Sequence, residues 1–182
     1  VTGNQNMGSA TAGSIGSGVT GFTGIKNAST WRLTVDFEMG TSAAVIGSGG
    51  NLEEVDSDSG GRIGSAMTHS SGVFTFPATG YWWIIAMATW EYSTAKDQAM
   101  NIEVTDDSGS TWSYASRGTE TYPDVTSGSG WSQMCIFFLM DLDNTSTRKV
   151  RFVADPFGNN QRIYGNTGYN ETAFTFIRLG DT

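Results

Sequence analysis

The amino-acid sequence predicts an all-β domain, organised as a sandwich or barrel of short antiparallel strands. Apolar and polar residues alternate with a period of two in several segments, which is typical of strands with one face in the core. Clusters of Gly, Ser, Asn and Asp separate these segments at short spacing. No segment combines a helical period of 3.6 with a cap and sufficient length, so we expect very little helix. About eight to ten strands around one core indicate a sandwich or barrel.

The first strand is predicted over residues 31–39, WRLTVDFEM. The intervening polar residues, such as Arg32 and Asp36, predict a second face toward water. The same period of two returns in residues 100–104 and 150–154, which we also predict as strands. The apolar side chains of the first strand are Trp31, Leu33, Val35, Phe37 and Met39.

Residues 71–90, SGVFTFPATGYWWIIAMATW, hold two apolar runs separated by PATG. Pro77 cannot donate a ladder hydrogen bond and Gly80 can take a positive φ, so we predict a hairpin-like corner between two strands. The strand after the corner is apolar on both faces, as is the run MCIFFLM at residues 134–140. Strands with two apolar faces need a further covering layer. In a domain without helices, we expect that layer to be another copy of the chain.

Charge and length exclude several classes of partner. The net charge is -8 and no Lys or Arg cluster occurs, which argues against nucleic acid as a partner. No apolar stretch approaches the roughly 18 residues needed to cross a bilayer, so membrane insertion is not expected. Cys135 is the single cysteine, which forbids an intrachain disulfide, and its apolar surroundings predict a small buried hydrophobe.

The chain is predicted to divide into a Gly/Ser/Thr-rich linker or stalk end at residues 1–28 and a head domain at residues 29–182. Residues 1–24 carry seven glycines together with Ser and Thr, and almost no large side chains. Such a composition cannot bury enough surface to fold alone. Glycines three residues apart leave an ordered stalk open as an alternative.

The sequence does not predict an enzyme. His69 is the sole histidine and no G-x-S-x-G elbow accompanies it, so we interpret it as a turn residue. The carboxylates of NLEEVDSDSG, residues 51–60, predict a solvated acidic loop. Oxygen ligands alternate in DSDSG and DLDN, which leaves calcium as an open alternative, and no other cofactor is expected.

A binding surface is predicted at residues 112–131, WSYASRGTETYPDVTSGSGW. Aromatic side chains among Ser and Gly combine rigid anchors with adaptable polar contacts. The rings could stack against sugars while the polar groups form hydrogen bonds. For the first two aromatic residues, a place in the core or between subunits is an equal alternative. The candidate ligand-binding residues are Trp112, Tyr114, Tyr122, Asp124 and Trp131.

The motif F-T-F-P-x-x-G-Y at residues 74–81 resembles the central signature of C1q-like heads, which are jelly rolls of the tumour necrosis factor (TNF) type. AFTFIRLGD at residues 173–181 resembles the closing strand of those heads. The resemblance covers roughly residues 29–180, although residues 112–131 are longer and richer in Tyr, Trp and Ser. It implies an antiparallel two-sheet jelly roll of about ten strands and a compact homotrimer. The residues predicted at the trimer interface or in the core are Tyr81, Trp83, Ile85, Met87, Phe138, Phe174 and Phe176.

Three segments, GVTGFTGIKNASTWRLT, NLEEVD and SSGVFTFP, are similar to the C-terminal heads of tail-fibre-like proteins of marine, cyanobacteria-infecting phages. This similarity implies a virion structural protein on the particle surface, in contact with other virion proteins. Its trimeric tip would bind a host-surface glycan or protein receptor. A capsid decoration (cement) protein is the first alternative. A secreted complement-like binding module is another, for which N-glycosylation triplets begin at Asn27, Asn144 and Asn170.

Overall fold

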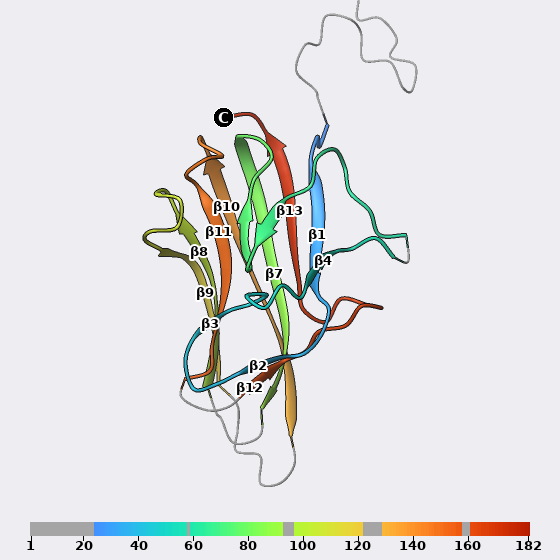
Figure 1. Cartoon of the computed structure of the whole chain (residues 1–182), viewed down its shortest axis with the longest axis vertical. Coiled ribbons are helices and arrows are strands. Elements are labelled where there is room, and N and C mark those ends of the chain that lie inside the picture. The colour runs from blue at the N-terminus through green and yellow to red at the C-terminus, as the bar shows by residue number, and fades with distance from the viewer. Residues whose placement is uncertain (1–23, 58, 93–96, 122–128, 158–160) are drawn as a thin grey trace, which may run out of the picture.

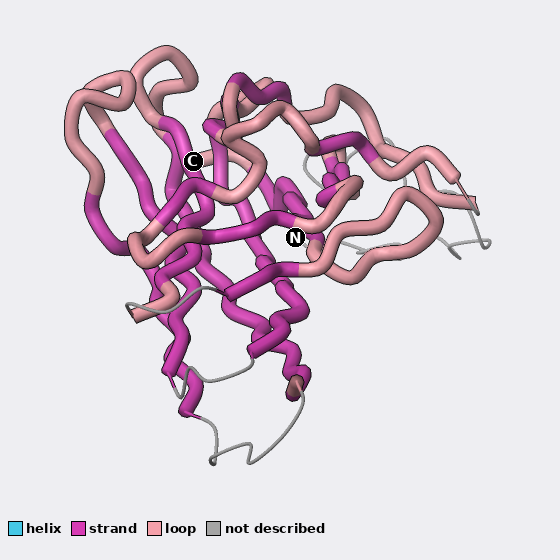
Figure 2. Tube along the Cα trace, turned by 60° about the horizontal axis from the view of Figure 1, so that its bottom comes forward, coloured by secondary structure: helices cyan, strands magenta, loops and turns pink. Residues whose placement is uncertain are grey.

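The structure is a computed structural model that describes residues 24–57, 59–92, 97–121, 129–157 and 161–182. Within these ranges the chain forms thirteen strands. Figure 2 shows strands joined by loops, without a helix in the described part of the chain. The strands form two antiparallel sheets that enclose one core (Figure 1). The predicted all-β, two-sheet sandwich is therefore confirmed.

The first sheet is organised around its longest strands, β7 and β10. β10 pairs with β7 along the whole length of both strands. The opposite edge of β7 pairs with β13 over one half and with β12 at the far end. β1 and β4 continue the sheet beyond β13, and β2 continues it beyond β12. The strands are β1 (Ala28–Leu33), β2 (Phe37–Met39), β4 (Leu52–Glu54), β7 (Gly80–Tyr92), β10 (Gly130–Leu142), β12 (Gln161–Ile163) and β13 (Ala173–Gly180).

The second sheet has the order β5-β6-β11-β8-β9, and β3 pairs with β11 beyond the end of β6. All of its pairings are antiparallel. Its strands are β3 (Ala44–Val45), β5 (Thr68–Ser70), β6 (Val73–Thr75), β8 (Asp97–Thr105), β9 (Ser113–Thr121) and β11 (Lys149–Asp155).

The core is rich in aromatic rings that both sheets supply. Alternate residues of β7, among them Trp82 and Trp90, point inward and are essentially inaccessible to water. Phe152 of β11 stacks on Phe174 of β13 with ring centroids 3.9 Å apart, which joins the two sheets. Phe74 contacts both of these rings from β6. Burial of such large apolar side chains is the main favourable contribution to folding.

The predicted corner between the two apolar runs is confirmed. β6 ends at Thr75 and β7 begins at Gly80, so residues 76–79 form the connection and the glycine of PATG starts β7. Gly80 has a φ of 130°, which an L-residue rarely adopts. The corner thereby directs β7 into the middle of the first sheet.

The strand predicted over residues 31–39 is in fact two strands, β1 and β2, and that prediction is wrong in the middle. The chain leaves β1 after Leu33, whose carbonyl accepts a hydrogen bond from the Asn166 backbone. The Asp36 carboxylate then accepts the backbone N–H of Gly165. These bonds to a distant loop interrupt the ladder, and Val35, predicted as apolar and inward, is 54% exposed.

Two predictions for polar residues are also corrected. Arg32 was expected to face water, but it is only 3% exposed because it lies between Glu53 and Ser57, to which it donates hydrogen bonds. His69 was interpreted as a turn residue, but it lies in β5. Its ring packs edge-on against Trp31, with centroids 4.9 Å apart, so it is a packing residue of the second sheet.

Candidate functional site

The outward face of the first sheet carries apolar side chains that the fold leaves uncovered. Residues paired across antiparallel strands share a face, so Phe137 lies beside Ile85. The rings of Trp83 and Phe137 stack with centroids 5.1 Å apart. Phe137 is still 59% exposed despite this contact. We name this group the apolar face; its members are Tyr81, Trp83, Ile85, Met87, Phe137, Leu139 and Ile177.

The apolar face exists because β7 and β10 are apolar on both sides, as the sequence predicted. Even-numbered residues of β10, such as Ile136, point into the core, and the odd-numbered ones point outward. Cys135 therefore lies on the outward side next to Met87 and is exposed, so the prediction of a buried cysteine is wrong. Contiguous exposed apolar surface of this kind marks a contact surface in soluble proteins.

The residues predicted at the trimer interface or in the core lie on both faces of the first sheet. Tyr81, Trp83, Ile85 and Met87 belong to the apolar face. Phe174 and Phe176 are fully buried in the core, where Phe176 packs against Phe74 and Phe76. Phe138 pairs with Ile84 on the inward side of the sheet and is half-buried.

The sequence analysis missed Phe137, Leu139 and Ile177 as members of the apolar face. The period-two spacing of Phe137 and Leu139 was visible in the sequence, whereas Ile177 lies on another strand, β13. Whether these residues point outward or into the core depends on the strand register, which only the structure provides.

At the other end of the same outward face, four paired strands bring one line of residues together. Glu38 of β2 pairs with Arg162 of β12. Arg162 pairs with Glu91 of β7, and Glu91 pairs with Trp131 of β10. We name Glu38, Arg162, Glu91 and Trp131 the polar row. Strands β2 and β12 lie at the end of the sandwich remote from the C-terminus (Figure 1).

Hydrogen bonds connect the polar row. Arg162 Nε donates to Glu91 Oε2 at 2.8 Å, and its Nη2 also pairs with this oxygen. The Tyr164 hydroxyl donates to the same carboxylate oxygen at 2.9 Å. Trp131 Nε1 in turn donates to the Tyr164 oxygen at 3.0 Å. The indole of Trp131 is thus held in a fixed orientation by a chain of bonds that ends on an ion pair.

Carboxylates outnumber cations around the polar row. Arg162 Nη1 lies 3.4 Å from Asp36 Oδ2 and 3.7 Å from Glu38 Oε1, in addition to its pair with Glu91. The hydrogen bond from Arg162 is the main cause that lowers the pKa of Glu91, and partial burial opposes it. Burial, followed by the charge of Asp36, raises the pKa of Glu171. This end of the face is therefore acidic.

The predicted ligand-binding residues do not form a single loop. Ser113–Thr121 is strand β9, so Trp112 and Trp131 lie at opposite ends of the sandwich. They are separated by nearly the length of β10, about 40 Å for thirteen extended residues. Tyr122 and Asp124 lie outside the described residues.

The structure places the two other aromatic candidates on the second sheet. Trp112 is half-buried, its ring covers the Arg151 guanidinium at 4.1 Å, and its Nε1 donates to the Gly109 carbonyl. Tyr114 is exposed, with Arg117 lying 5.5 Å from the centre of its ring. Of the three described aromatic candidates, Trp131 is the one that belongs to a polar cluster on the first sheet.

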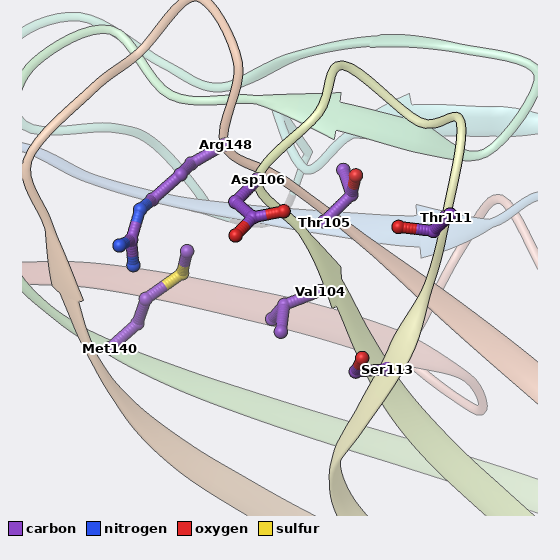
Figure 3. A pocket seen from close by; sticks show the side chains of 7 residues that line it. All are labelled: Val104, Thr105, Asp106, Thr111, Ser113, Met140 and Arg148. Carbon is purple, nitrogen blue, oxygen red and sulfur yellow. The ribbon is translucent and has the colours of Figure 1, made fainter.

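A pocket of about 140 Å³ lies where β8 turns into β9 (Figure 3). This volume is below the roughly 300–1,000 Å³ of typical ligand pockets. The adjoining turn is held by Asp107, whose carboxylate accepts bonds from Thr105 and Thr111 that keep its pKa well below its usual range. The pocket is lined by Val104, Thr105, Asp106, Thr111, Ser113, Met140 and Arg148.

Within the described ranges, no three His, Cys, Asp or Glu side chains gather as a metal-binding group. In the DLDN segment, Asp143 pairs with Arg148 and the Asn144 side chain accepts backbone N–H bonds of its own turn. The described part of the chain also has no helix that is long and apolar enough to span a membrane.

Comparison with solved structures identifies the fold. Eiger TNF from S. frugiperda superimposes with a TM-score of 0.60 at 7% identity, covering 85% of this chain and 93% of that one. Murine APRIL superimposes with a TM-score of 0.54 at 12% identity, covering 84% of this chain and 99% of that one. A scan against family models and a search of curated proteins find no match. The class of fold is therefore the jelly roll of the TNF type, as the motif at residues 74–81 predicted.

Proposed function

We propose that this chain is a non-enzymatic binding head that assembles as a homotrimer through its apolar face. The observation that carries the proposal is the uncovered set of large apolar side chains on β7, β10 and β13. Water contact with such a surface is unfavourable by about 25 cal/mol per Å² of apolar area. Three copies around one axis would cover it, in the arrangement that the C1q-like resemblance implies.

The head is further proposed to sit on a phage virion, at the tip of a tail fibre or similar appendage, where it contacts a host-surface receptor or glycan. The stalk-like composition of residues 1–28 and the similarity of residues 18–34 to phage fibre heads support this assignment. Labelling virions with an antibody against the head should mark the tail appendages in few copies. Labelling distributed over the capsid shell would instead assign it as a decoration protein.

A pair of matched variants tests the assembly. Phe137 on the apolar face and Tyr169 on the loop before β13 are both aromatic and both 59% exposed. Phe137→Asp should convert the trimer to monomers in sedimentation velocity, because a charge would have to be buried in the interface. Tyr169→Asp should leave the trimer intact. If both variants sediment as trimers, as the unaltered chain does, the apolar face is not the subunit interface.

A further inference from the structure

Trp131 combines high exposure with a fixed position. Its residue is 63% exposed. Its only polar atom, Nε1, is already bonded to the Tyr164 hydroxyl, and this hydroxyl is held by Glu91. The part of the side chain that remains for a ligand is the apolar ring itself. Because the ring is already oriented, a ligand that stacks on it loses little of its binding energy to ordering the side chain.

The groups around the ring supply hydrogen-bond acceptors. Gln133, two residues further along β10, is exposed, and its amide nitrogen donates to Thr89 Oγ1 at 3.3 Å, which leaves the amide oxygen to accept. At the far end of the polar row, the Glu38 side chain is 73% exposed. Hydroxyl groups of a ligand would donate to these oxygens.

The charge distribution selects against anionic ligands. Arg162 is the one cation of the polar row, and its bonds run to Glu91, Tyr164 and the neighbouring carboxylate of Asp36. With Glu38 in addition, three carboxylates surround one guanidinium. Among the described residues of this end, a sulfate, phosphate or carboxylate on a ligand would meet net negative charge.

The same distribution disfavours a cationic ligand at the ring. The carboxylate next to Trp131 is that of Glu91, which Arg162 already neutralises. The exposed carboxylate of Glu38 lies three strands away, about 14 Å at the usual strand spacing. An ammonium group on the ring that stacks on the indole could not reach it, so a neutral ring fits this position better.

We propose that Trp131, with Gln133 and Glu38, forms a binding site for a neutral carbohydrate, whose pyranose ring stacks on the indole. A pyranose has an apolar face for the ring and hydroxyl donors at its edge for the acceptors. The polar row spans four strands, so the ligand extends beyond one sugar ring. This assignment rests on the proposed role of the chain as a binding head and names the ligand class and its place.

The carbohydrate site lies beyond the apolar face along β10. Met87, the member of the apolar face nearest to this end of β7, pairs with Cys135, which is four residues from Trp131, or about 13 Å at about 3.3 Å per residue. The carbohydrate site and the apolar face therefore occupy different ends of one sheet face, and substitutions can separate their effects.

The test uses the full chain on an array that carries neutral, sialylated and sulfated glycans of defined structure. We expect binding to neutral glycans, with no preference for the anionic forms. Trp131→Ala should weaken that binding at least tenfold, and Trp131→Phe, which keeps an aromatic ring, should restore most of it. Tyr169→Ala, at a similarly exposed aromatic position (59%), should change it less than twofold. Melting temperature and sedimentation of each variant show whether fold and assembly persist.

Several results would overturn the proposal. Wild-type binding restricted to sialylated or sulfated glycans would contradict the charge argument, and unchanged binding by Trp131→Ala would remove the ring from the site. Loss of the trimer in Trp131→Ala would place this residue in the subunit interface instead. A trimeric head that binds whole host cells and yet binds no glycan on the array would be a different result. That result would refute the carbohydrate site but would leave the proposed function intact. A monomeric chain that binds neither glycans nor host cells would refute both the carbohydrate site and the proposed function.

Discussion

Replacement of Gly80 by alanine tests whether the corner before β7 determines the geometry of the first sheet. Gly80 has a φ of 130°, which alanine adopts only with strain. A Cβ built on Gly80 would overlap the carbonyl oxygen of Gly180 at the end of β13. It would also lie 2.8 Å from Nε of Arg178. That nitrogen donates to the Thr79 carbonyl at 2.6 Å, so the new methyl group would displace this bond as well.

The size of the effect follows from these two costs. A non-glycine residue held in a disfavoured backbone region costs about 1–3 kcal/mol. Overpacking against an atom that cannot easily retreat costs about 1–3 kcal/mol more. The Gly180 oxygen is backbone and belongs to a paired strand, so relaxation is limited. We expect Gly80→Ala to lower the free energy of unfolding by about 4 kcal/mol.

Urea denaturation measures this loss. The protein concentration is kept fixed, because the proposed assembly would make the midpoint depend on concentration. Gly61→Ala is the matched control, since Gly61 has no neighbour within 4 Å of an added Cβ. It should change the stability by less than about 0.5 kcal/mol. A Gly80→Ala variant as stable as this control would show that the corner does not need glycine and would refute the reasoning.

Three further predictions concern the polar residues and the core. Glu91 has a folded pKa below 4.5, so its stabilising contribution is present above that pH and is lost as the pH falls through the folded pKa. The Glu91→Gln variant should therefore have a lower melting temperature than the wild type at pH 7, and this difference in melting temperature should be smaller at pH 3. The same difference at both pH values would contradict the pairing with Arg162. Phe74→Ala should cost about 3–5 kcal/mol in urea denaturation, because the ring is fully buried; a cost under about 1 kcal/mol would contradict the described packing. Arg32→Met should cost about 1–3 kcal/mol by the same assay through loss of the hydrogen bonds to Glu53 and Ser57, and an unchanged midpoint would show that burial of the guanidinium contributes nothing.

The main elements of the fold were predictable because they depend on local patterns. Period-two alternation located the long strands, and Pro77 with Gly80 marked the corner between β6 and β7. The break between β1 and β2 was not predictable, because Asp36 bonds to Gly165, a residue 129 positions away in the sequence. The burial of Arg32 likewise depends on Glu53 of β4, a neighbouring strand.

The candidate sites were predictable only in part. The two-sided apolar character of residues 81–87 indicated an uncovered surface, whereas the choice of Phe137 over Phe138 required the register of β10 against β7. Trp131 was selected from composition alone. Its hydrogen-bond partner Tyr164 follows β12, and Glu91 of β7 connects Trp131 with Arg162 of β12. Such cross-strand pairing leaves no local signature in the sequence.

The most direct test of the account is the mass of the assembled wild-type chain in solution. Native mass spectrometry at micromolar concentration should give a single species at three times the 19.5 kDa chain mass. Dilution should not yield monomer until well below that concentration, because the apolar side chains of β7, β10 and β13 would then meet water. A stable monomer at high concentration would show that the apolar face needs no partner and would contradict the account.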